Sequence, residues 1–284
     1  MKDLKNLYPE KEYDVLNNGV KIPVIGYGTW LINNEIADKC VYEALEMGYR
    51  HIDSAQIYGN EVGVGKGMKM SSVKREDIFL TTKVDAKIKS YEKAKESIEK
   101  SLKKLDVDYI DLMIIHCPMP WNEYKLHGGY RYEKENLEVW RALEEAYEAG
   151  KLRAIGVSNF SEEDLDNILK NCKIPPMINQ IQICPGWTPI DNIEYCHKNN
   201  VVVEAYSPIA HGDALKNKTL IALADKYHVS VAQLCIRYTL QLDTVTLPKS
   251  TNPEHMKSNL KLDFIINEED MELMKAIHIP QYFE

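Results

Sequence analysis

The chain has 284 residues, of which 44% are hydrophobic and 27% are charged. These fractions are typical of a globular protein and argue against a disordered or fibrous chain. The 35 basic and 43 acidic residues give a formal net charge of −8, so nucleic acid, which requires a basic face, is not an expected partner.

Neither a membrane segment nor a metal site is expected. Charges are scattered through the first 14 residues, and no stretch approaches the roughly 18 apolar residues of a membrane span. The six cysteines are far apart and lack the Cys-x-x-Cys or His-Cys spacing of a metal site. We therefore expect reduced thiols, no bound metal, no signal peptide and a cytoplasmic location.

The order of predicted elements indicates a barrel. Asn17-Asn18-Gly19 predicts an opening β-hairpin, because Asn-Gly supplies the positive φ angles of a tight turn. Eight strand-like runs then alternate with segments of helical period, at 24–27, 49–53, 78–82, 109–115, 153–157, 177–180, 201–205 and 244–247. Eight strands, each followed by a helix, predict an α/β fold, a (β/α)8 TIM barrel in a single domain over 1–284.

Several features lie outside a minimal barrel. Ser161 followed by three acids predicts a helix N-cap. Extra helices are predicted at 220–227 and 268–277, and a long loop at 118–135. The glycines at 63, 65 and 67 do not match a dinucleotide-binding fingerprint and are expected to let a helix pack closely.

Titratable side chains follow three consecutive predicted strands. Asp53, Lys83 and His116 stand at successive strand ends, and Tyr58 follows Asp53 by five residues. Taken singly, each is more often a loop-capping acid, a surface lysine, a core histidine or a packed aromatic. Barrel enzymes place their chemistry at the carboxyl ends of strands, so the joint occurrence favours a catalytic site.

These four residue types suit the reduction of a carbonyl. Asp53 would pair with Lys83, and the ammonium would lower the pKa of Tyr58; two units correspond to about 2.7 kcal/mol. His116 would orient the carbonyl, and Tyr58 would donate the proton as charge develops on oxygen. A proton donor alone reduces nothing, so a hydride source is required.

Six stretches resemble the aldo-keto reductase superfamily, over a span from Pro23 nearly to the C-terminus. They are Gly48-Tyr49-Arg50-His51-Ile52-Asp53-Ser54-Ala55, Thr82-Lys83, Ile115-His116, Leu152-Arg153-Ala154-Ile155-Gly156-Val157-Ser158-Asn159-Phe160, Ala205-Tyr206-Ser207-Pro208 and Leu247-Pro248-Lys249-Ser250. The chain is similar to the bacterial type with a short C-terminal tail, such as diketogluconate and methylglyoxal reductases. The resemblance implies a catalytic tetrad of Asp53, Tyr58, Lys83 and His116, with Tyr58 as the general acid.

The same resemblance implies a nicotinamide cofactor, NADPH, with NADH as a second candidate. Ser158, Asn159 and Gln180 would bind the carboxamide, and Tyr206 would stack under the ring. The other residues it assigns to the cofactor are Gly28, Thr29, Trp30, Asp53, Ser207, Lys249, Ser250, Thr251, His255 and Asn259. Those assigned to the substrate, a small carbonyl compound, are Trp30, Tyr58, His116 and Cys117.

The chain departs from the family pattern at a few positions. His255 stands where relatives often carry arginine, which predicts a weaker preference for NADPH over NADH. Gln182 replaces a carboxylate that the family has two residues after Gln180. Asp85 and Cys117 replace aromatic residues, which predicts a more polar pocket for dicarbonyl or polyol-derived substrates.

Two other functions stay open at this point. A Schiff-base aldolase would use Lys83 as its nucleophile. A nucleotide-binding regulatory subunit would keep the fold and the cofactor with little turnover. A monomer is the expected state, with a dimer as the alternative.

Overall fold

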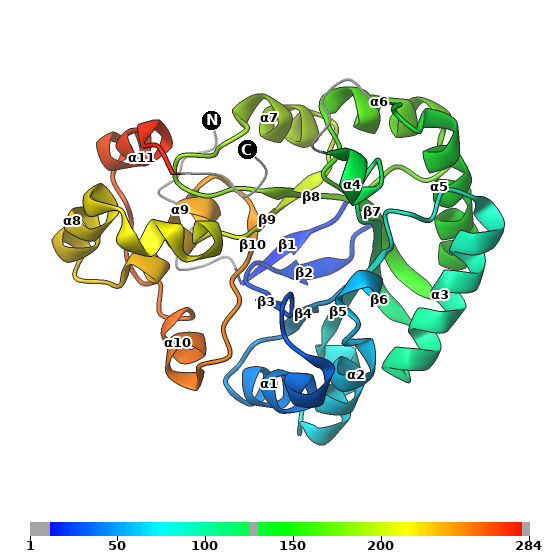
Figure 1. The fold of residues 1–284 in the computed structure, drawn as a ribbon, viewed down its shortest axis with the longest axis horizontal. Coiled ribbons are helices and arrows are strands. Elements are labelled where there is room, and N and C mark those ends of the chain that lie inside the picture. The colour runs from blue at the N-terminus through cyan, green and yellow to red at the C-terminus, as the bar shows by residue number, and fades with distance from the viewer. Residues whose placement is uncertain (1–11, 125–129, 280–284) are drawn as a thin grey trace.

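A nearly closed barrel of eight parallel strands forms the centre of the molecule (Figure 1). The computed structural model describes residues 12–124 and 130–279. Neighbouring strands pair in chain order, and a bridge between Ile25 and Thr246 joins the first to the last. The strands are β3 (Tyr27–Gly28), β4 (His51–Asp53), β5 (Phe79–Val84), β6 (Ile110–Ile115), β7 (Leu152–Ser158), β8 (Ile178–Gln182), β9 (Val202–Tyr206) and β10 (Val245–Leu247). The predicted barrel is confirmed.

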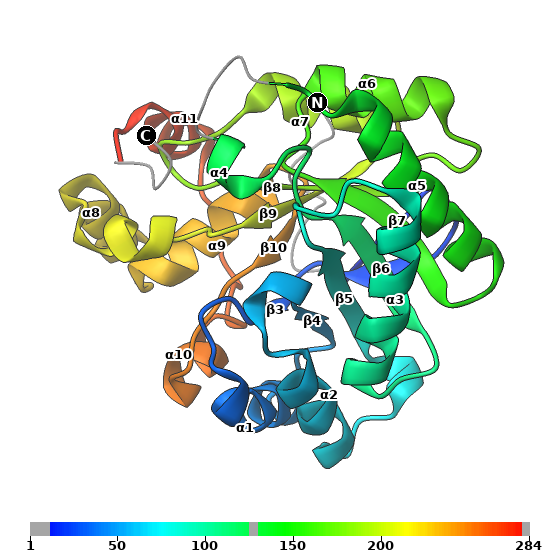
Figure 2. The same ribbon diagram turned by 45° about the vertical axis from the view of Figure 1, so that its right-hand side comes forward.

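Helices surround the strands on the outside (Figures 1 and 2). They are α1 (Asn34–Glu46), α2 (Glu61–Met70), α3 (Tyr91–Leu105), α4 (Trp121–Tyr124), α5 (Glu133–Glu148), α6 (Glu162–Asn171), α7 (Ile190–Lys198), α8 (Lys218–Tyr227), α9 (Val231–Gln241), α10 (Pro253–Ser258) and α11 (Glu268–Ala276). Short 3-10 turns are η2 (Gln56–Tyr58), η3 (Arg75–Asp77) and η4 (Ala210–Lys216). The two extra helices predicted from the sequence are α8 and α11. In the part of the chain that the structure describes, no helix has the length and apolarity needed to span a membrane.

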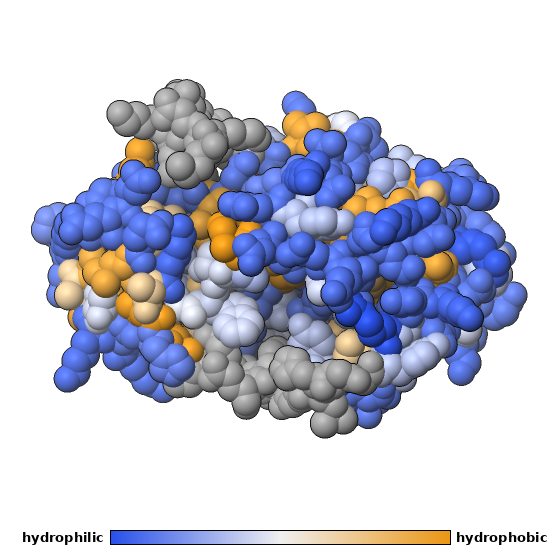
Figure 3. Space-filling view, turned by 90° about the horizontal axis from the view of Figure 1, so that it is seen from above, coloured by the Kyte–Doolittle hydropathy of each residue, from blue (hydrophilic) through white to orange (hydrophobic). Residues whose placement is uncertain are grey.

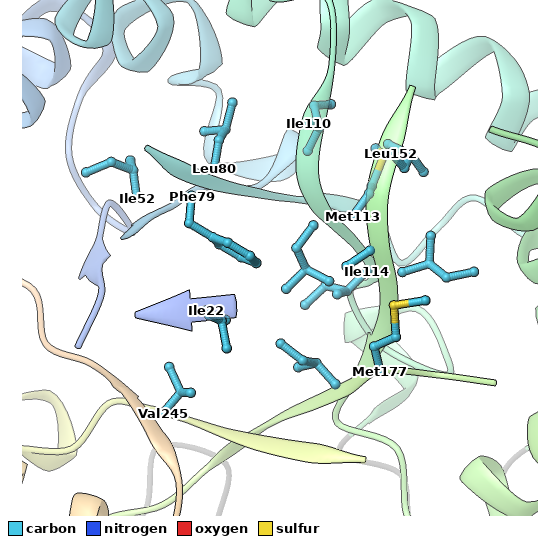
Figure 4. Packing of buried hydrophobic residues seen from close by; sticks show 14 of the residues in the cluster. Ile22, Ile52, Phe79, Leu80, Ile110, Met113, Ile114, Leu152, Met177 and Val245 are labelled. Atoms are coloured by element: carbon cyan, nitrogen blue, oxygen red, sulfur yellow. The ribbon is translucent and has the colours of Figure 1, made fainter. Parts of the chain in front are cut away.

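The N-terminal hairpin lies across the end of the barrel where the strands begin. Its strands β1 (Tyr13–Val15) and β2 (Lys21–Pro23) are antiparallel, as predicted. The amide of Asn17 donates to the carbonyl of Pro176, just ahead of β8, at 2.9 Å. Figure 4 shows Ile22 among buried side chains that include Phe79 and Val245, at the starts of β5 and β10. This end of the barrel is therefore filled by apolar packing, which leaves the opposite end for chemistry.

Local sequence signals set the helix ends and the helix packing. Ser161 caps α6 as predicted, because its hydroxyl accepts a hydrogen bond from the backbone N–H of Asp164. The Asp164 carboxylate in turn accepts a hydrogen bond from the backbone N–H of Ser161. Gly65 in α2 packs directly on the end of α3, because a Cβ there would overlap the carbonyl of Leu105. The predicted role of these glycines in close packing is confirmed. The face in Figure 3 is mostly hydrophilic, with apolar residues in separate patches.

Candidate active site

A completely buried lysine stands in β5 near the carboxyl end of the barrel strands. Lys83 Nζ lies 2.6 and 2.7 Å from the two carboxylate oxygens of Asp53 and donates to the Ser54 carbonyl at 2.8 Å. Asp53 ends β4, the neighbouring strand, and pairs with Thr81 in the ladder. Because alternate residues of a strand face the same side, the ladder that pairs Asp53 with Thr81 brings Lys83 beside the aspartate.

Tyr58 and His116 complete the group of four. Tyr58 ends the 3-10 turn η2 after β4, and the centre of its ring lies 5.1 Å from Lys83 Nζ. His116 follows β6, and its ring meets that of Tyr58 edge-on, with centroids 5.7 Å apart. The structure therefore brings together all four side chains that the sequence predicts as catalytic.

The prediction that the Lys83 ammonium lowers the pKa of Tyr58 is wrong. The pKa of Tyr58 is raised well above its ordinary value, first by burial, next by the negative charge of Asp53, and then by that of Glu204 when Glu204 is ionised. The reason is that burial of the phenol and the charge of Asp53, which lies 2.6 Å from the ammonium, outweigh the effect of Lys83 in the resting site. Tyr58 consequently keeps its proton at neutral pH.

His116 is a neutral imidazole. Burial, and next the positive charge of Lys83, lower its pKa well below the ordinary value. Its Nδ1 has no hydrogen-bond partner among residues 12–124 and 130–279. A proton on Nδ1 would be a buried unsatisfied donor, so the neutral ring favours the N–H on Nε2. His116 is thus suited to donate a hydrogen bond without carrying charge.

The predicted nicotinamide residues form a connected polar group on three neighbouring strands. Asn159 has a φ of 61°, a conformation that asparagine tolerates, and its amide donates to the His116 carbonyl at 3.1 Å. Its side-chain oxygen accepts from the Tyr206 hydroxyl at 2.8 Å. The Ser158 hydroxyl donates to the Gln180 backbone at 2.8 Å. This group therefore lies directly beside His116.

The predicted adenosine side follows β10. Lys249 and Ser250 are half-buried, whereas Thr251 and His255 are exposed. Asn259 is buried, and its side-chain oxygen has no hydrogen-bond partner in the described part of the chain. A buried amide oxygen without a donor fits a ligand that supplies one, such as the amino group of adenine.

Known proteins share this architecture. Residues 24–279 match the model of the aldo/keto reductase family. The chain belongs to the aldo/keto reductase family. It is 40% identical to a glyoxal reductase of Bacillus subtilis, an alignment that covers 93% of this chain and 91% of that protein.

Two solved structures are similar to this aldo-keto reductase. One is an aldo-keto reductase from a Medee basin deep-sea metagenome library, with a TM-score of 0.85, 40% identity and 94% of each chain covered. The other is a Bombyx mori aldo-keto reductase in complex with NADP, with a TM-score of 0.83, 32% identity, and 93% of this chain and 91% of that chain covered. The protein is therefore an oxidoreductase of a family that reduces carbonyl groups and uses nicotinamide cofactors.

An aromatic wall of the reductase site was not predicted. The ring of Trp121, in α4, meets that of His116 edge-on with centroids 5.2 Å apart, and Tyr124 meets Trp121 at 5.6 Å. This wall modifies the expectation of a less aromatic pocket, because α4 supplies the rings that positions 85 and 117 lack. The signal was Trp121 itself, five residues after His116, but a loop residue cannot be placed from the sequence.

The other residues predicted to bind cofactor or substrate differ in how far they are buried. Thr29 is buried, and its hydroxyl donates to the Asp53 backbone at 2.9 Å, beside Gly28 at the end of β3. Trp30 is half-buried, with its ring 5.0 Å from that of His211. Ser207 has a φ of 53° after β9.

Cys117 is one of the four residues that the resemblance assigns to the substrate. It is completely buried, and burial raises the pKa of its thiol to about 12, which does not favour contact with substrate. A group of three or more potential metal ligands is absent from residues 12–124 and 130–279.

Glu204 is the residue that sequence reasoning missed. It lies in the interior strand β9, is completely buried, and accepts a hydrogen bond from Gln180 Nε2 at 2.5 Å. The same nitrogen donates to Asp53 at 3.0 Å, so the amide of Gln180 joins two carboxyl groups. Burial, and next the charge of Asp53, raise the pKa of Glu204 to about 8.

Proposed function

We propose that this aldo-keto reductase converts aldehydes or ketones to alcohols by direct hydride transfer from NADPH, with Tyr58 as the general acid. The observation that carries the proposal is the meeting of Tyr58, Lys83, Asp53 and His116 at one end of the barrel. Their separations are given by the 2.6 Å ion pair, the 5.1 Å distance from ammonium to phenol ring and the 5.7 Å distance between the Tyr58 and His116 rings.

Tyr58 remains protonated until hydride addition to the carbonyl begins. Its raised pKa keeps the phenol neutral in the resting site. As hydride adds to the carbonyl carbon, the oxygen becomes strongly basic and takes the proton from Tyr58. The ammonium of Lys83 near the ring then stabilises the phenolate that is left. Neutral His116 donates a hydrogen bond to the same oxygen and fixes the orientation of the carbonyl.

The cofactor, when bound, supplies the hydride. Ser158 and Asn159 would hold its carboxamide, and Tyr206 would lie against the ring. Both N–H groups of Gln180 are engaged by Asp53 and Glu204, so its side-chain carbonyl is the atom suited to a carboxamide N–H. Asn259 would meet the adenine. Lys249 would meet a 2′-phosphate, whereas exposed His255 offers at most one further donor, so NADH should also serve.

We infer a small dicarbonyl as the substrate. The relative from Bacillus subtilis is named a glyoxal reductase. The rings of Trp121 and Tyr124 adjoin His116, and an aromatic wall at this position favours compact substrates over large rigid ones.

Competing functions fit the contacts less well. A Schiff-base aldolase needs a lysine with a free lone pair, whereas Lys83 donates hydrogen bonds to three oxygens. A non-catalytic nucleotide-binding subunit would have no use for the four assembled residues.

A substrate panel tests the proposal. Oxidation of NADPH and of NADH is followed with methylglyoxal, glyoxal, benzaldehyde and a ketosteroid. We expect turnover with the two dicarbonyls and weaker turnover with the steroid. Absence of oxidation with every carbonyl would contradict the proposed function, and borohydride trapping of Lys83 by a carbonyl substrate would favour the aldolase.

A further inference from the structure

The floor of the site holds two carboxyl groups for one ammonium. Asp53 is contacted by Lys83 Nζ at 2.6 and 2.7 Å and by the Gln180 amide at 3.0 Å. Glu204 accepts one hydrogen bond, from Gln180, and no described residue donates a hydrogen bond to its other oxygen, Oε1. Asp53 thus has a counter-charge and several hydrogen-bond donors, whereas Glu204 has a single donor.

An ionised carboxylate at the position of Glu204 would be poorly supported. Its side chain is completely buried, and a buried charge needs a counter-charge and several donors. Lys83 is engaged by Asp53, and the ring of His51, whose Nε2 lies 3.5 Å from Oε1, is itself completely buried. A protonated acid carries no charge, and an O–H on Oε1 faces His51 Nε2, the nitrogen of a neutral imidazole 3.5 Å away that can accept it.

We propose that Glu204 is a positioning residue that works in its protonated form, in which it holds the Gln180 amide against Asp53 and leaves Asp53 as the one counter-charge of Lys83. This inference rests on the proposed function, because it explains how Lys83 is kept in place beside Tyr58. Glu204 does not touch substrate. It acts through Gln180, which it fixes from the side of β9 while Asp53 fixes it from β4.

Ionisation of Glu204 would undo this arrangement. The groups that face it are Asp53 and His51 from β4, Lys83 from β5 and Tyr58 from η2. A second negative charge would repel Asp53, compete for Lys83 and further raise the pKa of Tyr58. With a pKa of Glu204 at about 8, the proton is lost only in mildly alkaline solution. Proton delivery should then become slower above that pH.

Two variants distinguish the effect of the protonation state of Glu204 from the effect of its contact with Gln180. Glu204→Gln places a neutral amide where the protonated acid stands, whereas Glu204→Ala removes the partner of Gln180. We expect Glu204→Ala to lower kcat/KM at pH 7 by roughly 10- to 100-fold, as for a small misplacement of a site residue. Glu204→Gln should restore most of that loss and abolish the alkaline decline seen with the natural glutamate.

Lys89 is a second group that titrates near the same pH as Glu204, and a variant at this position serves as the control. Burial lowers the pKa of Lys89 to about 8, and Lys89 donates to the Cys117 carbonyl and to the side chain of Asn136 in α5. Lys89→Arg keeps a positive charge that does not titrate. The alkaline decline should persist in this variant. A decline that vanishes in Lys89→Arg and stays in Glu204→Gln would overturn the proposal.

Infrared spectroscopy provides a readout that does not depend on turnover. The carbonyl stretching band of a protonated carboxylic acid should be present in the unmodified protein at pH 7, fade on titration through about pH 8, and be absent from Glu204→Gln. If the protein reduces no carbonyl, the proposed function fails while this band still tests Glu204. If the band is missing at pH 7, or Glu204→Gln is as impaired as Glu204→Ala, the inference about Glu204 is wrong.

Discussion

Replacement of Lys83 by methionine tests how the catalytic end of the barrel is held together. Methionine keeps most of the side-chain volume but removes the charge and three donated hydrogen bonds, to Asp53 at 2.6 and 2.7 Å and to Ser54 at 2.8 Å. Asp53 would be left with the Gln180 amide at 3.0 Å, facing Glu204. Breaking a buried ion pair on one side costs about 3–5 kcal/mol. At about 2–4 °C per kcal/mol for a protein of similar size, the melting temperature should fall by roughly 6–20 °C.

Thermal unfolding followed by circular dichroism measures this loss. The set comprises the unmodified protein, Lys83→Met, Asp53→Asn and the double variant, all at pH 7. Because the double variant leaves no unpaired charge, it should be more stable than Lys83→Met alone, with a coupling on the order of 1–3 kcal/mol. A melting temperature of Lys83→Met within about 2 °C of the unmodified protein would refute the reasoning.

Four further predictions concern stability, substrate binding and cofactor choice. Burial and Lys83 lower the pKa of His51 in the folded protein to about 3, whereas an unfolded histidine titrates near ~6.5. Between these two pH values the unfolded state binds more protons than the folded state. The free energy of unfolding should therefore fall by up to about 1.4 kcal/mol per pH unit as the pH decreases below ~6.5. Urea unfolding of His51→Gln should accordingly vary less between pH 7 and pH 5 than that of the unmodified protein, and an equal variation would contradict this. Gly65→Ala should lower the free energy of unfolding by about 1–3 kcal/mol, because the new methyl group meets the α3 backbone. The control Lys66→Ala, at an exposed neighbouring position, should change it little. Equal urea midpoints for the two variants would contradict this prediction. Trp121→Ala should raise KM for methylglyoxal about fivefold with a smaller change in kcat, as expected for the loss of about 1 kcal/mol of aromatic contact, and an unchanged KM would remove Trp121 from the substrate wall. His255→Arg should increase the ratio of kcat/KM for NADPH over NADH about tenfold or more, and an unaltered ratio would show that position 255 does not meet the phosphate.

The barrel was predictable because local patterns and the global fold agree. The eight strands, the hairpin at Asn17-Asn18-Gly19 and the N-cap at Ser161 each follow from a few neighbouring residues. Strand ends were less certain. The first barrel strand extends only over Tyr27–Gly28, because Val24 and Ile25 contribute single contacts that close the barrel.

The candidate site was predictable only in part, because residue type and strand position were visible but distances were not. The four catalytic candidates stand at strand ends that any barrel brings together. The pKa of Tyr58 could not be inferred, because it depends first on the burial of the phenol and next on the proximity of Asp53 and Glu204. Glu204 was missed because an acid within an apolar strand gives no sign of its partner, Gln180, which lies on the neighbouring strand.

The most direct test of the account is the behaviour of Tyr58→Phe. NADPH oxidation with methylglyoxal is measured together with NADPH binding by fluorescence titration, on this variant and the unmodified protein. Loss of a general acid should lower kcat by about 10²–10⁴-fold. The dissociation constant for NADPH should stay within about threefold, because the hydroxyl of Tyr58 serves the carbonyl and not the cofactor. A kcat within about tenfold of the unmodified protein would contradict the claim that Tyr58 delivers the proton.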